Sequence, residues 1–150
     1  MANRKYGHRK QSSLEEKTYL ELLQTTDRLT RGVASVLKTD ELSVTQYNVL
    51  RILRGSPEGL PCGEIGRRLI TREPDITRLF DRMEKRGLIS RCREPKDRRT
   101  VLTRITKAGL DCVNGLDEPI QALHRMQLGH LGREQLLSLS NLLRKARRQP

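Results

Sequence analysis

Apolar residues recur every three or four positions near both ends of the chain. Between residues 13 and 38 this spacing predicts one long amphipathic helix, because a helix completes a turn in about 3.6 residues. Residues 108–131 and 133–147 show the same period, and Pro119 is expected to bend the first of these two helices. The apolar stripes are too extensive to be buried by one chain of 150 residues that also has a separate small core.

We therefore expect the terminal helices to bury their stripes against a second copy of the chain. Two-fold dimers commonly form through such self-complementary surfaces. The expected interface residues are Leu22, Leu29, Leu136, Leu139 and Leu143.

Capping residues divide the middle of the chain into shorter helices. Ser43 and Gln46 have the spacing of a capping box, which predicts a helix that begins after Ser43 and stops at Gly55. A short helix is expected over residues 62–69, directly after Pro61.

A further helix is expected to begin near residue 71 or 73 and to end at Gly87, with Pro74 in its first turn. One arc of this helix is apolar and should pack inward: Ile76, Leu79, Phe80 and Met83. The opposite side is polar, with Thr77 on its flank: Pro74, Asp75, Arg78, Asp81, Arg82 and Lys85. A buried face opposite a guanidinium-rich face suits insertion into the major groove of DNA, where arginine pairs with guanine. The alternative is an ordinary solvated face, in which these cations pair with Asp81 and Glu84.

Two β-type runs follow, over residues 88–93 and 100–106, and they predict a hairpin with a basic tip. The tip carries Lys96, Arg98 and Arg99 beside Asp97. Such a loop is typical of a wing that lays an arginine along the minor groove, and Asp97 is expected to orient a neighbouring guanidinium. The alternative is a surface hairpin whose charges face solvent.

The distribution of charge adds to this interpretation. The net charge is +12, and residues 60–109 carry 14 Lys and Arg against 7 Asp and Glu. Both flanking segments, 11–59 and 110–141, are slightly acidic. A positive block of this kind indicates a surface that binds a polyanion. Charge alone would equally fit an RNA-binding or ribosomal protein, but three Tyr, one Phe and no Trp leave little to stack on single-stranded bases.

The order of helix, helix, helix-turn-helix, hairpin and two helices resembles the MarR (multiple antibiotic resistance regulator) family. The resemblance covers roughly residues 13–147, and it is carried by residues 65–69, 75–89 and 97–109. Its most specific part is an Asp-x-Arg wing followed by a strand and a Thr-x-x-Gly helix start, matched by Asp97, Arg99, Thr106 and Gly109. The family's peroxide sensors carry a reactive cysteine near the amino end, whereas the first cysteine here is Cys62.

The resemblance implies an obligate homodimer that binds a palindromic operator in double-stranded DNA, often released by a small ligand or an oxidant. The expected fold is α+β and mostly α, a winged helix-turn-helix with long dimerisation helices at both ends. We expect a disordered basic tail over residues 1–12 and one regulator domain over 13–150, with its DNA-reading part at 43–106 and its dimerisation helices at 13–38 and 107–147. The residues expected at the DNA are Thr71, Arg72, Asp75, Thr77, Arg78, Arg82, Lys96, Asp97, Arg98 and Arg99.

Other chemistry has little support in the sequence. No hydrolytic triad, Walker loop or dinucleotide fingerprint is present, so we expect neither an enzyme nor a cofactor. Three cysteines without a CxxC spacing indicate a reducing cytosol, and His124 and His130 do not share a helical face that could bind a metal. Cys62 begins a helix, which could activate its thiol, but an inert thiol is the simpler interpretation. No apolar run is long enough to cross a membrane.

Two rival functions stay open. The first is a small-molecule sensor whose DNA binding is weak or lost, which a deep pocket between the dimer helices and the winged part would favour. The second is a protein that compacts nucleic acid without sequence preference, which competition with random duplex would distinguish.

Overall fold

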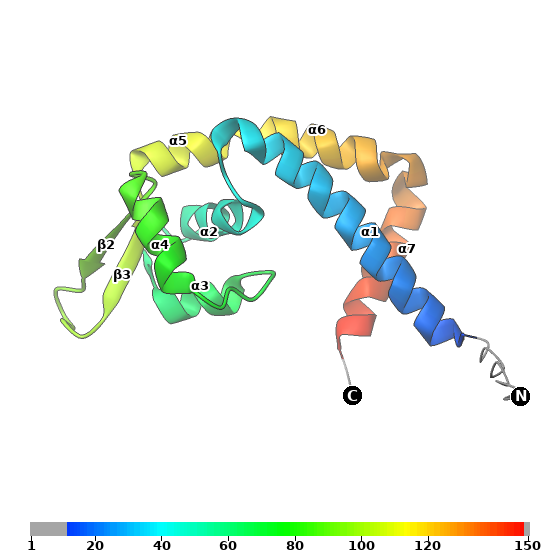
Figure 1. The fold of residues 1–150 in the computed structure, drawn as a ribbon, viewed down its shortest axis with the longest axis horizontal. Coiled ribbons are helices and arrows are strands. Elements are labelled where there is room, and N and C mark those ends of the chain that lie inside the picture. Colours follow the sequence, from blue (N-terminus) through cyan, green and yellow to red (C-terminus); the bar gives the residue numbers. More distant parts are fainter. Residues whose placement is uncertain (1–11, 149–150) are drawn as a thin grey trace, which may run out of the picture.

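The computed structural model describes residues 12–148, and it consists of a winged-helix part and a set of long helices (Figure 1). The tail predicted for residues 1–12 lies outside the described residues except for Ser12. The elements follow the order α1 (Leu14–Leu37), η1 (Lys38–Asp40), α2 (Val44–Arg54), β1 (Leu60–Pro61), α3 (Cys62–Arg68), α4 (Ile76–Lys85), β2 (Ile89–Arg93), β3 (Val101–Ile105), α5 (Lys107–Gly115), α6 (Asp117–Leu128), η2 (Gly129–Leu131) and α7 (Gly132–Arg147). The predicted α+β, mostly helical winged fold is confirmed.

The winged part contains a small antiparallel sheet in the order β1-β3-β2. Ile89 pairs with Ile105 across the hairpin, and Leu60 pairs with Thr103 on the other side of β3. The sequence predicted the hairpin but missed β1, because a two-residue strand is too short to show an alternating pattern.

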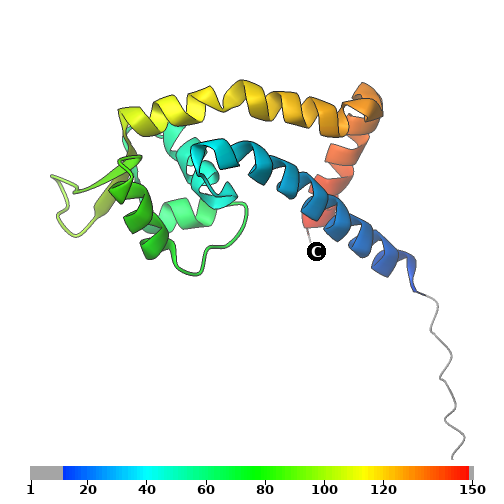
Figure 2. The ribbon, with the colours of Figure 1, turned by 45° about the horizontal axis from the view of Figure 1, so that its top comes forward.

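The core lies where α2, α3, α4 and the sheet meet the inner ends of α1 and α5. Its fully buried side chains include Leu37, Leu50, Leu53, Ile65, Leu79, Phe80, Met83, Ile89 and Val113. The predicted capping box is present at the start of α2, where Ser43 and Gln46 each satisfy the other's backbone N–H. The inner end of α1 therefore belongs to the core of the winged part, while its outer turns extend away from it (Figure 2).

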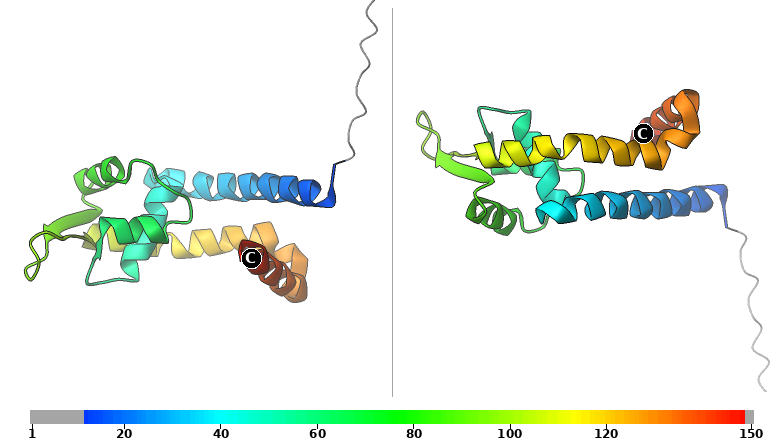
Figure 3. Two further views of the ribbon diagram at one scale, coloured as in Figure 1. Left: turned by 90° about the horizontal axis from the view of Figure 1, so that it is seen from below. Right: turned by 90° about the horizontal axis from the view of Figure 1, so that it is seen from above.

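The long helices form an open arrangement. Figure 3 shows α1 running beside the α5–α6 pair, and α7 turning back at the end farthest from the hairpin. In the single chain α7 packs mainly against η2, so its leucines are largely uncovered. None of the helices in the part of the chain that the structure describes is long and apolar enough to cross a membrane.

Two predicted boundaries are wrong. The helix expected to begin near residue 71 or 73 starts at Ile76, so Pro74 precedes the helix instead of lying in its first turn. The helix expected over residues 108–131 is divided at Leu116. Pro119 has no N–H to donate to the carbonyl of Gly115, so the chain breaks there and places Pro119 in the first turn of α6.

Candidate nucleic-acid interface

Helix α4 has one buried and one exposed face, as the sequence predicted. Leu79, Phe80 and Met83 are almost completely buried, and Ile76 is half-buried against Gly66 of α3. The opposite face is open to solvent and presents Thr77, Arg78, Arg82 and Lys85. Burial of the apolar arc thus orients the cationic arc outward.

Both ends of α4 are capped by hydrogen bonds. At its start the Asp75 carboxylate accepts the N–H of Arg78 at 3.1 Å, so Asp75, a residue expected at the DNA, is the N-cap of α4. At its end the Gly87 N–H donates to the backbone carbonyl of Glu84, and the Leu88 N–H donates to the carbonyl of Met83. This is the Schellman pattern. Gly87 has a φ of +70°, the conformation that this ending requires and that glycine adopts without strain.

The acidic residues of α4 pair with the sheet and not with the cations of their own helix. The Arg91 guanidinium on β2 contacts Asp81 at 2.6 Å and Glu84 at 2.6 and 3.0 Å, and the Arg91 N–H also donates to Glu84. Arg91 holds the pKa of Glu84 below its usual value. The alternative in which Asp81 and Glu84 neutralise the neighbouring helical cations is therefore wrong.

As a result, the outward cations of α4 have no ion-pair partner in the part of the chain that the structure describes. Among residues 12–148 no carboxylate lies within ion-pair distance of Arg78, Arg82 or Lys85. These side chains surround a shallow hollow between α4 and β2 together with Arg91. The role of Arg91 is not predictable from the sequence, because strand alternation alone does not place it beside α4.

The β2–β3 loop is ordered by Asp97. Its carboxylate accepts the N–H of Arg99 at 3.1 Å and the hydroxyl of Thr100 at 2.8 Å, and its carbonyl accepts the Thr100 N–H. The expectation that Asp97 orients a guanidinium is wrong in this structure. The carboxylate instead forms a local turn with the N–H two residues ahead and the hydroxyl three residues ahead.

The turn leaves the basic side chains of the loop exposed. Lys96, Arg98 and Arg99 all project into solvent at the tip of the hairpin. Figures 1 and 3 show α4 and the hairpin at the same end of the molecule, opposite α7. Thr71 and Arg72, also expected at the DNA, are exposed in the segment that leads into α4.

The cysteines and the two histidines within residues 12–148 form no reactive centre. Burial raises the pKa of the Cys62 thiol, which favours the inert interpretation over activation by the helix dipole. Within the described part of the chain, no three His, Cys, Asp or Glu side chains gather closely enough to hold a metal ion.

Comparisons with known proteins agree with this geometry. The model of the MarR family matches residues 42–101, which cover α2 to the start of β3. The crystal structure of a MarR transcription factor from Planctomyces limnophilus is 42% identical, with a TM-score of 0.69 over 89% of this chain and 98% of that one. The chain belongs to the MarR family.

One further relative of this MarR-family chain is named as a transcriptional repressor, and one further solved structure shares its fold. The HTH-type transcriptional repressor IacR of Pseudomonas putida is 29% identical over 77% of this chain and 69% of its own length. A mutant MarR from E. coli, solved in complex with operator DNA, has a TM-score of 0.79 over 90% of this chain and 99% of that one. At 22% identity this last likeness concerns the fold alone.

Family membership confirms two of the predictions made from sequence. Proteins of the MarR family are transcription regulators and not enzymes, and they bind DNA. Which residues of this chain touch DNA is a separate question.

Proposed function

We propose that this MarR-family regulator represses transcription by binding a palindromic operator as a homodimer, with α4 in the major groove and the β2–β3 loop in the flanking minor groove. Thr77, Arg78 and Arg82 would read base edges from α4. The remaining contacts would come from Thr71, Arg72 and Asp75 before and at the helix start, and from Lys96, Asp97, Arg98 and Arg99 in the loop. The division into a DNA-reading part at 43–106 and dimerisation helices at 13–38 and 107–147 belongs to the same proposal.

The observation that carries the proposal is the separation of charges on α4. Arg91 engages Asp81 and Glu84 at the side of the helix, which leaves Arg78 and Arg82 exposed without a carboxylate partner among the described residues. An unpaired guanidinium retains its donors for guanine or phosphate, and each good bidentate base contact discriminates by about 1–3 kcal/mol. A helix whose charged face has no binding role would gain nothing from pairing its acidic residues with Arg91 and leaving its arginines without a carboxylate.

The loop supports the same function. Asp97 holds the backbone of the turn through the Arg99 N–H and the Thr100 hydroxyl. An arginine presented on an ordered turn loses less conformational entropy on binding than one on a loose loop. Arg99 can therefore enter a narrow minor groove, where the negative potential is strongest.

The proposed dimer rests on leucines that a single chain leaves uncovered. Leu22, Leu139 and Leu143 are each 37% exposed, and Leu29 and Leu136 are half-buried. They belong to helices that also expose Tyr19, Leu20, Leu23, Leu137 and Leu142. Exposed apolar surface on this scale is typical of an interface.

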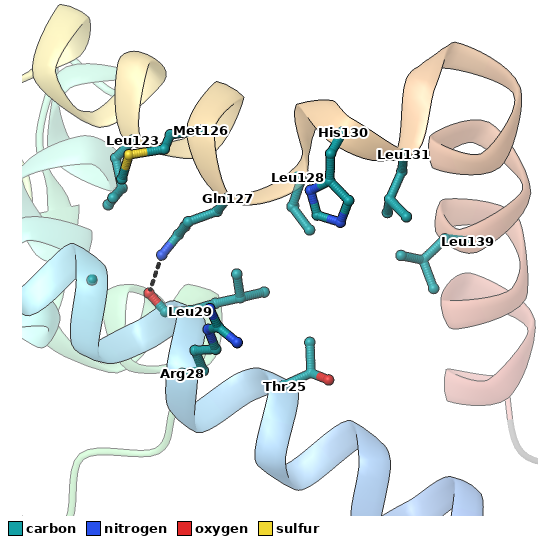
Figure 4. Close-up of a pocket in the computed structure, with 11 residues that line it drawn as sticks. Thr25, Arg28, Leu29, Leu123, Met126, Gln127, Leu128, His130, Leu131 and Leu139 are labelled. Atoms are coloured by element: carbon teal, nitrogen blue, oxygen red, sulfur yellow. Dashed lines mark hydrogen bonds between the residues drawn. The ribbon is translucent and has the colours of Figure 1, made fainter.

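A hollow between these helices fits the same interpretation. Side chains of α1, α6, η2 and α7 face a cavity of about 730 Å³, with Leu29, Leu128, Leu131 and Leu139 on its walls (Figure 4). The residues that line the cavity come from the proposed dimerisation helices and η2 and not from α2, α3, α4 or the sheet, so it does not favour the rival function of a small-molecule sensor. We assign it to apolar side chains of the second copy.

Selection of binding sites from a random duplex pool tests the proposal. We expect an enriched two-fold symmetric site with half-site centres about 10 base pairs apart, as a dimer with two recognition helices requires. Anisotropy titrations should then give at least about 10³-fold tighter binding to that site than to random duplex. Equal affinity for both would contradict the proposal and favour the nucleic-acid-compacting alternative.

A further inference from the structure

The carboxyl end of α4 meets the carboxyl end of α1. Helix α1 and η1 finish in a Schellman pattern, with the Leu42 N–H bonded to Leu37 and the Glu41 N–H bonded to Lys38. The Arg86 guanidinium, from the C-cap of α4, donates to the Asp40 carbonyl at 2.8 Å and to the Glu41 carbonyl at 2.7 Å. One arginine thus joins the proposed recognition helix to the end of a proposed dimerisation helix.

The chemistry of this junction explains why an arginine occupies it. The last carbonyls of a helix are unpaired and carry the negative end of its dipole. Helix α1 has no basic residue in its own last turn and η1 has Lys38 in its last turn, so the guanidinium from α4 adds a second positive charge at this end. Its forked donors reach two adjacent carbonyls at once, which a lysine ammonium on a flexible stem does less well.

The backbone at the junction is strained. Glu41 has a φ of +53°, and it is the only non-glycine residue with a positive φ among the described residues. Such a conformation is unfavourable for a residue with a side chain and persists where neighbouring contacts hold it. The bond from Arg86 to the Glu41 carbonyl is one of these contacts.

A second dimerisation helix is attached at the same place. The Thr106 hydroxyl, which caps α5, donates to the Gly87 carbonyl at 2.6 Å, and the Thr106 N–H donates to the Leu88 carbonyl at 3.1 Å. Gly109 faces the Leu88 carbonyl so closely that no Cβ could fit between them. The end of α4 is therefore held by α1 on one side and by α5 on the other.

We propose that Arg86 is a positioning residue that fixes the angle of α4 to the dimerisation helices and thereby sets the half-site spacing that the dimer accepts. This inference rests on the proposed function. A helix of ten residues is about 15 Å long, so a tilt of about 10° at its carboxyl end displaces its amino end by roughly 2–3 Å. That displacement exceeds the tolerance of a hydrogen bond to a base edge.

The test measures separately the preference for one half-site spacing and the overall affinity for DNA. Arg86→Ala, Arg86→Lys and the unmodified protein are titrated against the selected operator, against versions lengthened or shortened by one central base pair, against a single half-site and against random duplex. Lys107→Ala is the matched control, because it removes one positive charge near the same junction, and Lys107 pairs only with Asp111 among residues 12–148. Circular dichroism and sedimentation verify that each variant is folded and dimeric.

We expect the unmodified protein and Lys107→Ala to prefer the original spacing by about tenfold or more, or about 1.4 kcal/mol. In Arg86→Ala this preference should fall below about threefold, with affinity for the single half-site and for random duplex changed by less than about twofold. The spacing preference of Arg86→Lys should lie between those of the unmodified protein and Arg86→Ala.

An unchanged spacing preference in folded Arg86→Ala would overturn the proposal. So would an equal loss of affinity for every duplex, which would make Arg86 a phosphate contact. If Arg86→Ala is not folded, Arg86→Lys with an unaltered preference would overturn it. If the unmodified protein shows no preference for a two-fold site, the proposed function fails first and this inference falls with it.

Discussion

Glu84 on α4 accepts three hydrogen bonds from Arg91 on β2, two from the guanidinium and one from the backbone N–H. The side chain of Arg91 is only 25% exposed, so this pair is shielded from solvent more than the other ion pairs at this end of the molecule. The pair binds the proposed recognition helix to the wing and neutralises a carboxylate beside the exposed arginines of α4.

The first prediction follows from that pair. Arg91→Ala should weaken binding to operator and random duplex by about tenfold, because it leaves two carboxylates uncompensated near the phosphates. The double substitution Asp81→Asn with Glu84→Gln should change DNA affinity little when Arg91 is present. Combined with Arg91→Ala, it should restore most of the affinity that Arg91→Ala loses. Anisotropy titrations complete the double-mutant cycle, with an expected coupling of about 1 kcal/mol. Equal effects of the double change in both backgrounds would mean that Arg91 does not mask the carboxylates.

The second prediction concerns the wing. Arg99→Ala should cost about 1–3 kcal/mol of operator binding, the worth of a specific contact. Asp97→Ala should also weaken binding, although it removes a negative charge, because the turn loses the acceptor for the Arg99 N–H and the Thr100 hydroxyl. Asp97→Asn is the control, since its amide oxygen can still accept a hydrogen bond, and it should bind better than Asp97→Ala. Tighter binding by Asp97→Ala at every salt concentration would reduce Asp97 to a repulsive charge.

The third prediction separates base reading from charge attraction. Arg78→Ala should lower the ratio of operator to random affinity by about tenfold, which is within the worth of one bidentate base contact. Deleting residues 1–10, with four positive charges, should weaken both duplexes about equally and reduce the salt dependence. Titrations of both duplexes at several salt concentrations measure the two effects. If Arg78→Ala loses the same affinity for both, Arg78 contacts phosphate and base reading lies elsewhere on α4.

The fourth prediction concerns assembly. Replacing Leu136, Leu139 and Leu143 with Ser should abolish the dimer and operator binding together, because the interface loses most of its apolar contribution from α7. Asn141→Ser, on the other side of α7, should change neither. Analytical ultracentrifugation gives the oligomeric state, and a folded monomer of the unmodified protein at micromolar concentration would contradict the proposed dimer.

The fifth prediction concerns the junction of α4 with α5. Gly109→Ala should lower the free energy of unfolding by about 2 kcal/mol or more, because its Cβ would collide with the backbone carbonyl of Leu88. Gly115→Ala is a matched control, since nothing lies within 4 Å of its Cβ position, and it should be neutral or stabilising by up to about 1 kcal/mol. Urea unfolding at a fixed protein concentration compares the two. Equal stability of the two variants would contradict the close approach of Gly109 to the Leu88 carbonyl.

The sequence by itself determined the local elements and the faces of α4. Hydrophobic periodicity depends on residues three or four apart, so Leu79, Phe80 and Met83 could be assigned to the core without coordinates. The capping box at Ser43 and the glycine ending at Gly87 are equally local signals. The family resemblance rested on such short patterns, and the comparisons confirmed it.

Only the tertiary structure decided which charges meet. Asp81 is three residues from Arg78 and four from Lys85 in the sequence, yet Asp81 and Glu84 both pair with Arg91 from the sheet. Arg86 reaches carbonyls 45 and 46 residues away. Long polar side chains have many accessible partners, and the one they choose depends on the packing of whole elements, which no local pattern encodes. The polar contacts that bind α4 to the rest of the molecule therefore became visible only once the elements were assembled.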